Sequence, residues 1–321
     1  MQRHPNPRLA LAIPTYQRSE ILCENLKEML PEIREHAIPV YISDDSKDEA
    51  TAQMVEALRM EYEFIYYRRN VPGLGHDRNF FATIAMPDSD YVWYLGDSLS
   101  LRPGVLGEVL AQTRDGRDFF FVNAYVPDQR DRVLSGAEVK DFLLDRAWYL
   151  TLSGATVYGR RPRSLQVAEE RRKQWKNFPQ LGLILEFASQ HAASCAWVGT
   201  PSIQFNKKKK SYWQRTALDV FVRDWAALVR SFPALFSPAE ADQIIRSHGV
   251  NTGVFGLKWL VMLRAAGGLN AAELKALGSD FALASPISPQ WAKLVCLIPP
   301  LLAKAVWSGA RAIKGSIRRS A

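Results

Sequence analysis

Short apolar runs alternate with longer stretches in which apolar residues recur every three or four positions over the first hundred residues of the chain. A short run bounded by turn residues is typical of a buried strand, whereas the longer spacing is that of an amphipathic helix. The runs lie at 9–13, 40–43, 64–67 and 91–95, and the helical spacing lies at 19–33, 50–60 and 78–85. We expect Ser19 to cap the first of these helices. Strands that alternate with helices predict an α/β fold, with a mainly parallel sheet flanked by helices.

The pattern changes in the second half of the chain. Residues 119–122 form one more apolar run, and residues 160–176 are strongly basic. The basic stretch is predicted to be a loop that faces phosphate groups or an ordinary solvated surface, and the residue pattern leaves both open. From about residue 215, apolar residues recur at helical spacing between scattered prolines, which predicts a helical C-terminal region.

Polar residues stand directly after three of the predicted strands. The carboxyl ends of strands in an open α/β sheet lie along one edge, and ligands bind in the crevice outside that edge. We therefore predict a ligand site there. Its members are Thr15, Tyr16 and Arg18 after the first strand, Asp44 and Asp45 after the second, and Asp97 after the fourth.

Composition and missing motifs narrow the function classes. The 321 residues are 47% hydrophobic, as in a globular chain, and the three cysteines are too few for a disulfide scaffold. Pro-Thr-Tyr follows the first strand in place of a glycine-rich turn, which disfavours a nicotinamide Rossmann site. The sequence has no Walker-type phosphate loop and no G-x-S-x-G elbow, so a P-loop nucleotidase and an α/β-hydrolase are excluded. The net charge is +8, but no zinc finger, RNP-like strand or basic zipper is present, so we expect no nucleic-acid partner.

Four segments share an order and a position at strand ends. They are AIPTYQR at 12–18, ISDDSKD at 42–48, NVPGLGHDRN at 70–79 and YVWYLGD at 91–97. Together they resemble the signature of family-2 glycosyltransferases with a GT-A fold. The closest likeness is to the branch that builds bacterial O-antigen and other surface polysaccharides, abequosyltransferase-like enzymes included. The resemblance covers about the first hundred residues and fades beyond residue 125.

The resemblance implies a role for each predicted site residue. Asp97 would stand where the family places its D-x-D metal motif, and would act in catalysis. The other residues would bind the donor: Pro14, Thr15, Tyr16 and Arg18 in the nucleotide pocket, Asp44 or Asp45 on the base or ribose, and Gly75, Arg78 and Asn79 against the nucleotide or the sugar.

We expect three regions. By the resemblance, residues 1–125 would form the nucleotide-sugar-binding half of a GT-A domain, and residues 126–214 the acceptor-binding half. By its own residue pattern, the segment 215–321 would form the helical C-terminal region with its basic amphipathic tail.

The metal position departs from the family pattern, because Gly96-Asp97-Ser98-Leu99 holds one carboxylate where the family usually has two or three. Magnesium is commonly held by one or two carboxylates together with substrate phosphates and water, so Asp97 can still anchor Mg²⁺ or Mn²⁺. Such an ion would meet the negative charge that develops on the diphosphate leaving group. Arg78 could share that charge through its planar guanidinium.

Structural roles compete with these assignments. Asp97 could simply close the turn after the fourth strand, and the two aspartates after the second strand could cap the helix that follows. Arg78 could form a surface ion pair with Asp77 or Asp88.

Inverting transfer also needs a base that accepts the proton of the acceptor hydroxyl. Glu186 is the only acid between Glu170 and Asp219, and it lies within the apolar segment 181–187. Apolar surroundings desolvate a carboxylate and make it a better proton acceptor, so Glu186 is the predicted base. The alternative is a helix glutamate that faces water.

The charge excess gathers at the C-terminal end, where no acid follows Asp280. Tryptophan and leucine residues alternate there with basic residues, which is the composition of an interfacial helix. We predict either contact with a membrane surface or a docked helix with a solvated basic face. The basic residues are Lys293, Lys304, Arg311, Lys314, Arg318 and Arg319.

The sequence shows neither a membrane span nor a secretion signal. No apolar stretch reaches the ~20 residues that a span needs. The segment 1–7 lacks the apolar region of a signal peptide. We therefore expect a cytoplasmic protein, at the inner face of the cell membrane if the tail binds lipid.

Two functions are consistent with these features. The first is a metal-assisted, inverting glycosyltransferase that moves a sugar from a nucleotide-sugar donor onto a glycan or lipid-linked acceptor in surface polysaccharide synthesis. The second is a catalytically impaired GT-A-like module that binds nucleotide sugars, which the single carboxylate of the metal motif favours.

Overall fold

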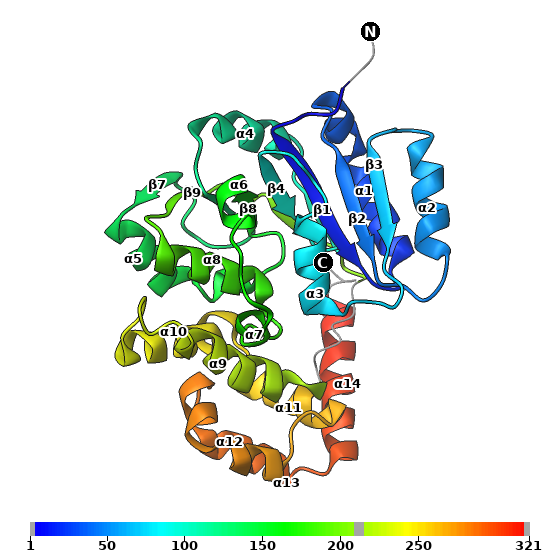
Figure 1. The fold of residues 1–321 in the computed structure, drawn as a ribbon. Helices are drawn as coiled ribbons and strands as arrows, with labels where there is room; N and C mark the ends of the chain where they lie inside the picture. The colour runs from blue at the N-terminus through cyan, green and yellow to red at the C-terminus, as the bar shows by residue number, and fades with distance from the viewer. Residues whose placement is uncertain (1–3, 209–214, 318–321) are drawn as a thin grey trace. The chain divides into compact units, whose positions relative to one another are not determined.

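The computed structural model describes residues 4–208 and 215–317. The chain divides into two compact units, residues 1–209 and 210–321, and each is described by itself (Figure 1). The predicted division of the first unit at residue 125 stays a prediction. The predicted boundary at residue 214 lies outside the described residues.

The first unit is built on an eight-stranded sheet with the order β3-β2-β1-β4-β8-β6-β9-β7. Neighbours run parallel from β3 through β4 and between β6 and β9, whereas β8 and β7 run antiparallel to their neighbours. A separate two-stranded sheet pairs β5 (Leu99–Leu101) with β10 (Ile203–Phe205). The predicted α/β class is confirmed. The eight strands are β1 (Leu9–Thr15), β2 (Val40–Asp44), β3 (Ile65–Arg69), β4 (Tyr91–Tyr94), β6 (Phe119–Val122), β7 (Arg132–Ser135), β8 (Thr156–Gly159) and β9 (Ser194–Val198).

Helices cover both faces of this sheet, and α1 and α3 lie on opposite faces near β1 and β2 (Figure 1). This placement follows from right-handed crossovers, because the strand order reverses between β3 and β4. The helices of the first unit are α1 (Ser19–Glu35), α2 (Ala50–Arg59), α3 (His76–Ile84), α4 (Val105–Gln112), α5 (Ala137–Arg146), α6 (Arg160–Arg163), α7 (Glu169–Lys173) and α8 (Pro179–Gln190), with 3₁₀ turns at η1 (Thr113–Asp115) and η2 (Tyr149–Thr151).

Two local predictions were wrong. Ser19 is the first residue of α1 and Arg18 stands at the N-cap position, where no side-chain capping bond forms because a guanidinium has no acceptor for a helix N–H. The helix predicted over 78–85 is confirmed as α3, which begins two residues earlier, at His76, after Gly75 with φ 77°. The segment 160–176 contains the helices α6 and α7 rather than a loop.

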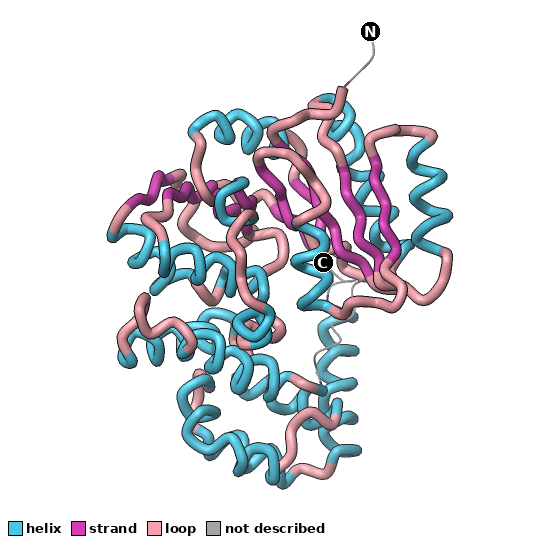
Figure 2. Tube along the Cα trace, in the orientation of Figure 1, coloured by secondary structure: helices cyan, strands magenta, loops and turns pink. Residues whose placement is uncertain are grey.

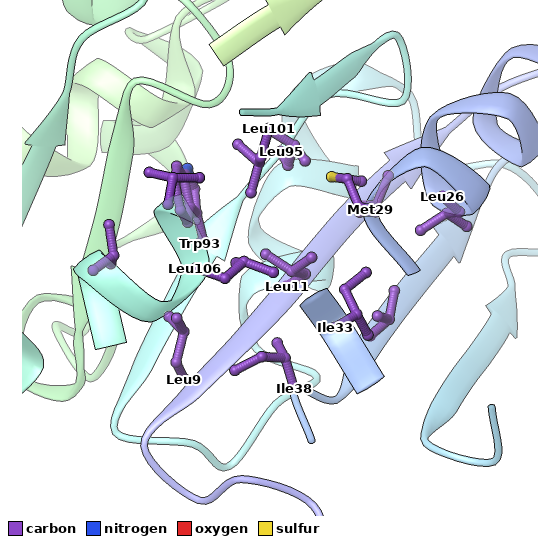
Figure 3. Close-up of a cluster of buried hydrophobic side chains, with 14 of the residues drawn as sticks. Leu9, Leu11, Leu26, Met29, Ile33, Ile38, Trp93, Leu95, Leu101 and Leu106 are labelled. Carbon is purple, nitrogen blue, oxygen red and sulfur yellow. The ribbon is translucent and has the colours of Figure 1, made fainter. Parts of the chain in front are cut away.

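One hydrophobic core of the first unit lies between the sheet and α1. All residues of Leu9–Ile13 are buried, as expected for a central parallel strand covered on both faces. Leu26, Met29 and Ile33 of α1 project onto this strand at helical spacing, and Trp93 of β4 closes the cluster (Figure 3). Each such side chain contributes about 1.5–3 kcal/mol by burial, so the cluster holds the strand ends in place.

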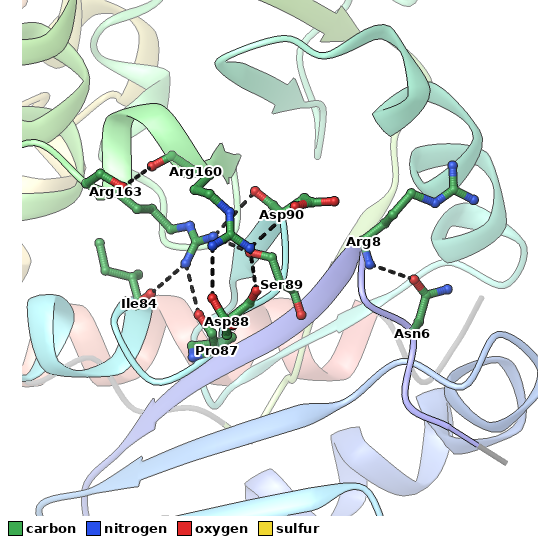
Figure 4. A network of polar contacts seen from close by, with 10 residues as sticks. Asn6, Arg8, Ile84, Pro87, Asp88, Ser89, Asp90, Arg160 and Arg163 are labelled. Carbon is green, nitrogen blue, oxygen red and sulfur yellow. Dashed lines mark hydrogen bonds and ion pairs between the residues drawn. The ribbon is translucent and has the colours of Figure 1, made fainter. Parts of the chain in front are cut away.

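The basic helix α6 is anchored at the amino end of β4. The half-buried guanidinium of Arg163 donates to the carbonyls of Ile84, Pro87 and Ser89, and this burial lowers its pKa to about 10 (Figure 4). Arg160 pairs with Asp88 at 2.9 Å. These two arginines therefore bind the α3–β4 connection.

Every element described in the second unit is a helix, which confirms the predicted helical C-terminal region (Figure 2). Helix α10 begins with a capping box between Ser237 and Glu240. The elements are the π-helix η4 (Asp219–Asp224), α9 (Trp225–Arg230), α10 (Pro238–Thr252), α11 (Leu257–Ala266), α12 (Ala271–Ala284), α13 (Pro289–Leu297) and α14 (Pro300–Ile317).

Candidate functional site

The carboxyl ends of β1 and β4 bring three predicted residues together. The Thr15 hydroxyl donates to Oδ2 of Asp97 at 3.2 Å, and Nη1 of Arg18 donates to Oδ1 at 3.1 Å. Asp97 is buried, whereas about a quarter of the Arg18 side chain is exposed. A buried carboxylate thus receives one hydroxyl and one guanidinium at the edge where ligands bind in open α/β sheets.

A second pair of side chains holds the backbone of Asp97. Nδ2 of Asn25 donates to the Asp97 carbonyl at 2.8 Å, and Nδ2 of Asn206 donates to Oδ1 of Asn25 at 3.1 Å. Our sequence reasoning missed Asn25. Its signal was available, because Asn25 is a polar residue between Leu22 and Leu26 on the apolar face of α1.

Asp45 organises the turn that precedes α3. Its carboxylate accepts hydrogen bonds from the backbone N–H groups of Leu74 and Gly75, at 3.1 and 2.8 Å, and from Nδ2 of Asn70 at 2.8 Å. Its own backbone N–H donates to the Thr15 carbonyl at 3.0 Å. Thr15 therefore connects the Asp97 group to this turn, and the two form one continuous rim.

Asp44 and Asn79 are buried, and their side chains bond to nearby protein groups. The Asp44 carboxylate accepts from the Ser46 N–H at 2.8 Å and from the Tyr67 hydroxyl at 2.9 Å. Burial and this hydrogen bond raise the pKa of Tyr67 well above its ordinary value. Asn79 accepts from the Ser43 hydroxyl at 2.6 Å and donates to its carbonyl at 3.3 Å. Both groups shape the end of β2.

The remaining donor-binding candidates lie on the same rim with more exposure. Nε of Arg78 donates to the Leu74 carbonyl at 3.0 Å, so the turn held by Asp45 also orients this exposed arginine. Tyr16 is half exposed, and Pro14 is partly buried at the end of β1. Asp77 contacts His76, and Asp88 contacts Arg160, so neither is the ion-pair partner proposed for Arg78 as an alternative.

The structure does not bring Glu186 together with Asp97. Glu186 lies in α8, where Oε2 accepts from Nε of Arg171 at 2.8 Å and Oε1 accepts from Nε2 of Gln190 at 2.6 Å. The adjacent Phe187 contacts Phe119 at the amino end of β6, with ring centroids 5.6 Å apart. Since β6 runs in the same direction as β4, this places Glu186 toward the edge opposite Asp97.

The residues around Asp97 could supply only some of the oxygen ligands of a hard divalent ion. Within residues 4–208 and 215–317, no group of three or more His, Cys, Asp or Glu side chains is placed to hold a metal ion. Asp97 and the Thr15 hydroxyl offer oxygen ligands, and a carboxylate retains acceptor capacity beyond its two bonds. These residues therefore suit Mg²⁺ or Mn²⁺ if the donor phosphates and water supply the remaining ligands.

Comparison with known proteins agrees with this geometry. Abequosyltransferase RfbV of Salmonella typhimurium is 37% identical over 95 residues, which span 29% of this chain and 28% of that protein. A crystal structure of S. aureus TarS 1-349 in complex with UDP-GlcNAc has a TM-score of 0.55 at 14% identity, covering 95% of this chain and 92% of that one. The structure of the same TarS fragment in complex with UDP has a TM-score of 0.55 at 15% identity, covering 90% of each chain.

These structural likenesses show a shared fold, which confirms the predicted GT-A-like architecture. The model of the family described as "Glycosyl transferase family 2" matches residues 10–171, which is half of the chain and includes the whole rim around Thr15, Asp45 and Asp97. The chain belongs to glycosyl transferase family 2.

Proposed function

We propose that this chain is a glycosyltransferase that moves a sugar from a nucleotide-sugar donor, with inversion, onto a glycan or lipid-linked acceptor of a surface polysaccharide. One observation carries the proposal: Arg18, Thr15 and Asp97 meet at the carboxyl edge of a family-2 sheet, and Asp45 joins them to the turn before α3. The relatives reported above bear the names of glycosyltransferases or were solved with UDP or UDP-GlcNAc, which supports a nucleotide-sugar donor.

The chemistry asks the site to meet negative charge on a leaving diphosphate. A divalent ion held by Asp97 would supply Lewis-acid stabilisation of that charge. The Arg18 guanidinium, which lies against Asp97 in the described structure, presents a planar fork of donors suited to phosphate oxygens. Arg78 is oriented on the same rim by Leu74 and would share the charge.

Glu186 was predicted from the sequence as the base for inversion. Its place toward the edge opposite Asp97 and its ion pair with Arg171 argue against this role, so we propose no base from α8. Replacement of Glu186 by Gln removes the carboxylate and keeps the shape, and we expect it to leave turnover unchanged.

The proposal is tested by nucleotide release from a panel of UDP- and GDP-sugars, with and without Mg²⁺ or Mn²⁺. We expect Asp97→Asn to lower turnover by about 100-fold or more, as removal of a key electrostatic group does, and to abolish the metal-linked gain in donor binding. Asp88→Asn is the matched control, because Asp88 is an exposed aspartate at the other end of β4.

Two outcomes contradict the proposal. Equal binding and turnover in Asp97→Asn and the wild type would remove Asp97 from the site. Donor binding without turnover for every donor, with acceptor mixtures present, would identify the second candidate, a nucleotide-sugar-binding module.

We also propose that an anionic membrane surface is the partner of the C-terminal helices. Leu297 is 78% exposed and Leu301 83% exposed, and Trp291, Leu294, Leu302 and Val306 also expose large parts of their side chains. Lys293 and Lys304 lie among them, and no acid follows Asp280. Apolar side chains beside basic ones suit a surface that offers both acyl chains and negative headgroups. Arg318 and Arg319, part of the predicted basic tail, lie outside the described residues.

A further inference from the structure

Two exposed aromatic rings lie beside each other in the first unit. Tyr125 is 51% exposed and Phe205 is 46% exposed, and their ring centroids are 6.1 Å apart. Exposed aromatic side chains that adjoin one another often mark a binding surface. The predicted site residues do not include either ring.

Both rings lie at the edge of the sheet that carries Asp97. Tyr125 follows the carboxyl end of β6, which runs in the same direction as β4. Phe205 pairs with Leu99, two residues after Asp97, in the small β5–β10 sheet.

Hydrogen bonds connect Phe205 firmly to the candidate site. The backbone N–H of Asn206 donates to the Ser98 carbonyl at 3.0 Å. The Asn206 side chain donates to Asn25, whose own amide donates to the Asp97 carbonyl. The position of the Phe205 ring is therefore coupled to that of Asp97 through two asparagines.

Buried aromatic residues support Tyr125 from beneath. Its ring centroid is 5.5 Å from that of Tyr149 and 6.4 Å from that of Trp148. Tyr149 donates its hydroxyl to the Val122 carbonyl at 2.7 Å, and Nε1 of Trp148 donates to the Asp145 carbonyl at 2.9 Å. Because these contacts already restrict the Tyr125 ring, it loses little conformational entropy when a ligand binds to its exposed face.

We propose that Tyr125 and Phe205 form an aromatic platform that binds a pyranose ring of the acceptor glycan; this inference rests on the proposed function. A pyranose presents C–H groups on its faces and hydroxyls around its rim, so it stacks on an aromatic ring while its hydroxyls stay hydrated or hydrogen-bonded. Tyrosine suits this role because it combines an apolar ring with a polar tip. The two rings lie at the same sheet edge as Asp97, where the acceptor hydroxyl must reach the sugar donor. We therefore assign the platform to the acceptor sugar.

The test measures binding of methyl glucopyranoside, galactopyranoside and mannopyranoside by saturation-transfer NMR and titration, with UDP present. We expect at least one glycoside to bind the wild type. Tyr125→Ala and Phe205→Ala should each weaken that binding by about fivefold or more, because truncation removes the apolar contact area. Tyr125→Phe should stay within about twofold, since the ring is kept. Val133→Ala is the matched control, an exposed apolar residue of strand β7.

The outcomes separate this inference from the proposed function. UDP affinity should be unchanged in both alanine variants, and thermal melting checks that they fold. Unchanged glycoside binding in Tyr125→Ala and Phe205→Ala, or no glycoside binding by the wild type, overturns the platform. If the wild type binds no UDP, the proposed function is contradicted instead. The two results can be told apart because UDP binding and glycoside binding are measured on separate NMR signals.

Discussion

At the scale of single residues, Thr15 links two parts of the candidate site, because its backbone and its side chain each form a hydrogen bond with a different aspartate. Its carbonyl accepts from the Asp45 N–H, and its hydroxyl donates to the Asp97 carboxylate. One residue at the end of β1 thus sets the spacing between the turn before α3 and the proposed metal ligand. Precise spacing of this kind is what a site for a charged diphosphate requires.

The first prediction concerns Asp45. Asp45→Ala leaves the Leu74 and Gly75 N–H groups without their carboxylate acceptor. We expect the free energy of unfolding to fall by about 1 kcal/mol, the net contribution of a typical hydrogen bond, because water reaches the exposed Gly75. Affinity for the nucleotide part of the sugar donor should fall about tenfold, because the turn before α3 is held less firmly. Urea unfolding and UDP titration measure the two effects.

Asp48→Ala is the control for this substitution, because Asp48 accepts one exposed hydrogen bond, from the N–H of Ala50, in the same connection. If both variants behave alike, Asp45 has no organising role in the turn.

At the scale of elements, helices α13 and α14 expose more large apolar side chains than the other described helices of the second unit, where Val250 and Leu257 are also exposed. No single described helix is long and apolar enough to cross a membrane, although α13 and the first part of α14, bent by 104°, meet that length and composition test together. Leu297 and Leu301 flank the bend at Pro299-Pro300. Burial of each would favour an interface by about 1.5–3 kcal/mol.

The prediction for these helices uses flotation of the full-length chain with phosphatidylglycerol vesicles. We expect the wild type to float at low salt, less of it at high salt because headgroup attraction is screened, and Leu297→Ser and Leu301→Ser each to lower the bound fraction. Met60→Ser, an exposed apolar position in the first unit, is the control. A wild-type chain that stays unbound at low salt contradicts the membrane proposal.

At the scale of the whole molecule, we expect the free energy of unfolding to depend on pH through His248. This residue is buried in α10, where its ring lies 4.9 Å from that of Phe221 and 5.4 Å from that of Trp225, measured between centroids. Burial lowers the pKa of His248 to about 4. The unfolded chain therefore binds this proton more tightly than the folded one between about pH 6.5 and pH 4.

Protonation of His248 therefore favours the unfolded chain. As the pH falls through this window, the free energy of unfolding should decrease, by up to about 3 kcal/mol from this group. His248→Phe should flatten that slope, as urea unfolding at pH 7 and pH 4.5 would show. His191→Phe, at an exposed position, serves as the control. An unaltered slope in His248→Phe would assign the pH dependence to other groups.

Much of the fold could be predicted because its signals are local. The apolar runs at 9–13 and 40–43 became β1 and β2, and the four motifs led to the family that the family model confirms. The helix start at residue 19 was right, but the capping role of Ser19 was wrong, because Ser19 is already inside the helix and Arg18 stands at the N-cap position. The local pattern therefore located this helix without deciding how its first turn is satisfied.

The sequence by itself determined which residue types stand at the strand ends and that they share one edge, since alternation of strands and helices is encoded in neighbouring residues. Tertiary structure alone decided which groups meet: Asn25 reaches Asp97 across 72 positions, whereas Glu186 pairs with Arg171. It likewise placed Phe205 next to Tyr125 through the β5–β10 pairing. The physical reason is that hydrogen bonds and ring contacts act over a few ångströms, and the distances between remote residues are set by strand order and register rather than by local pattern.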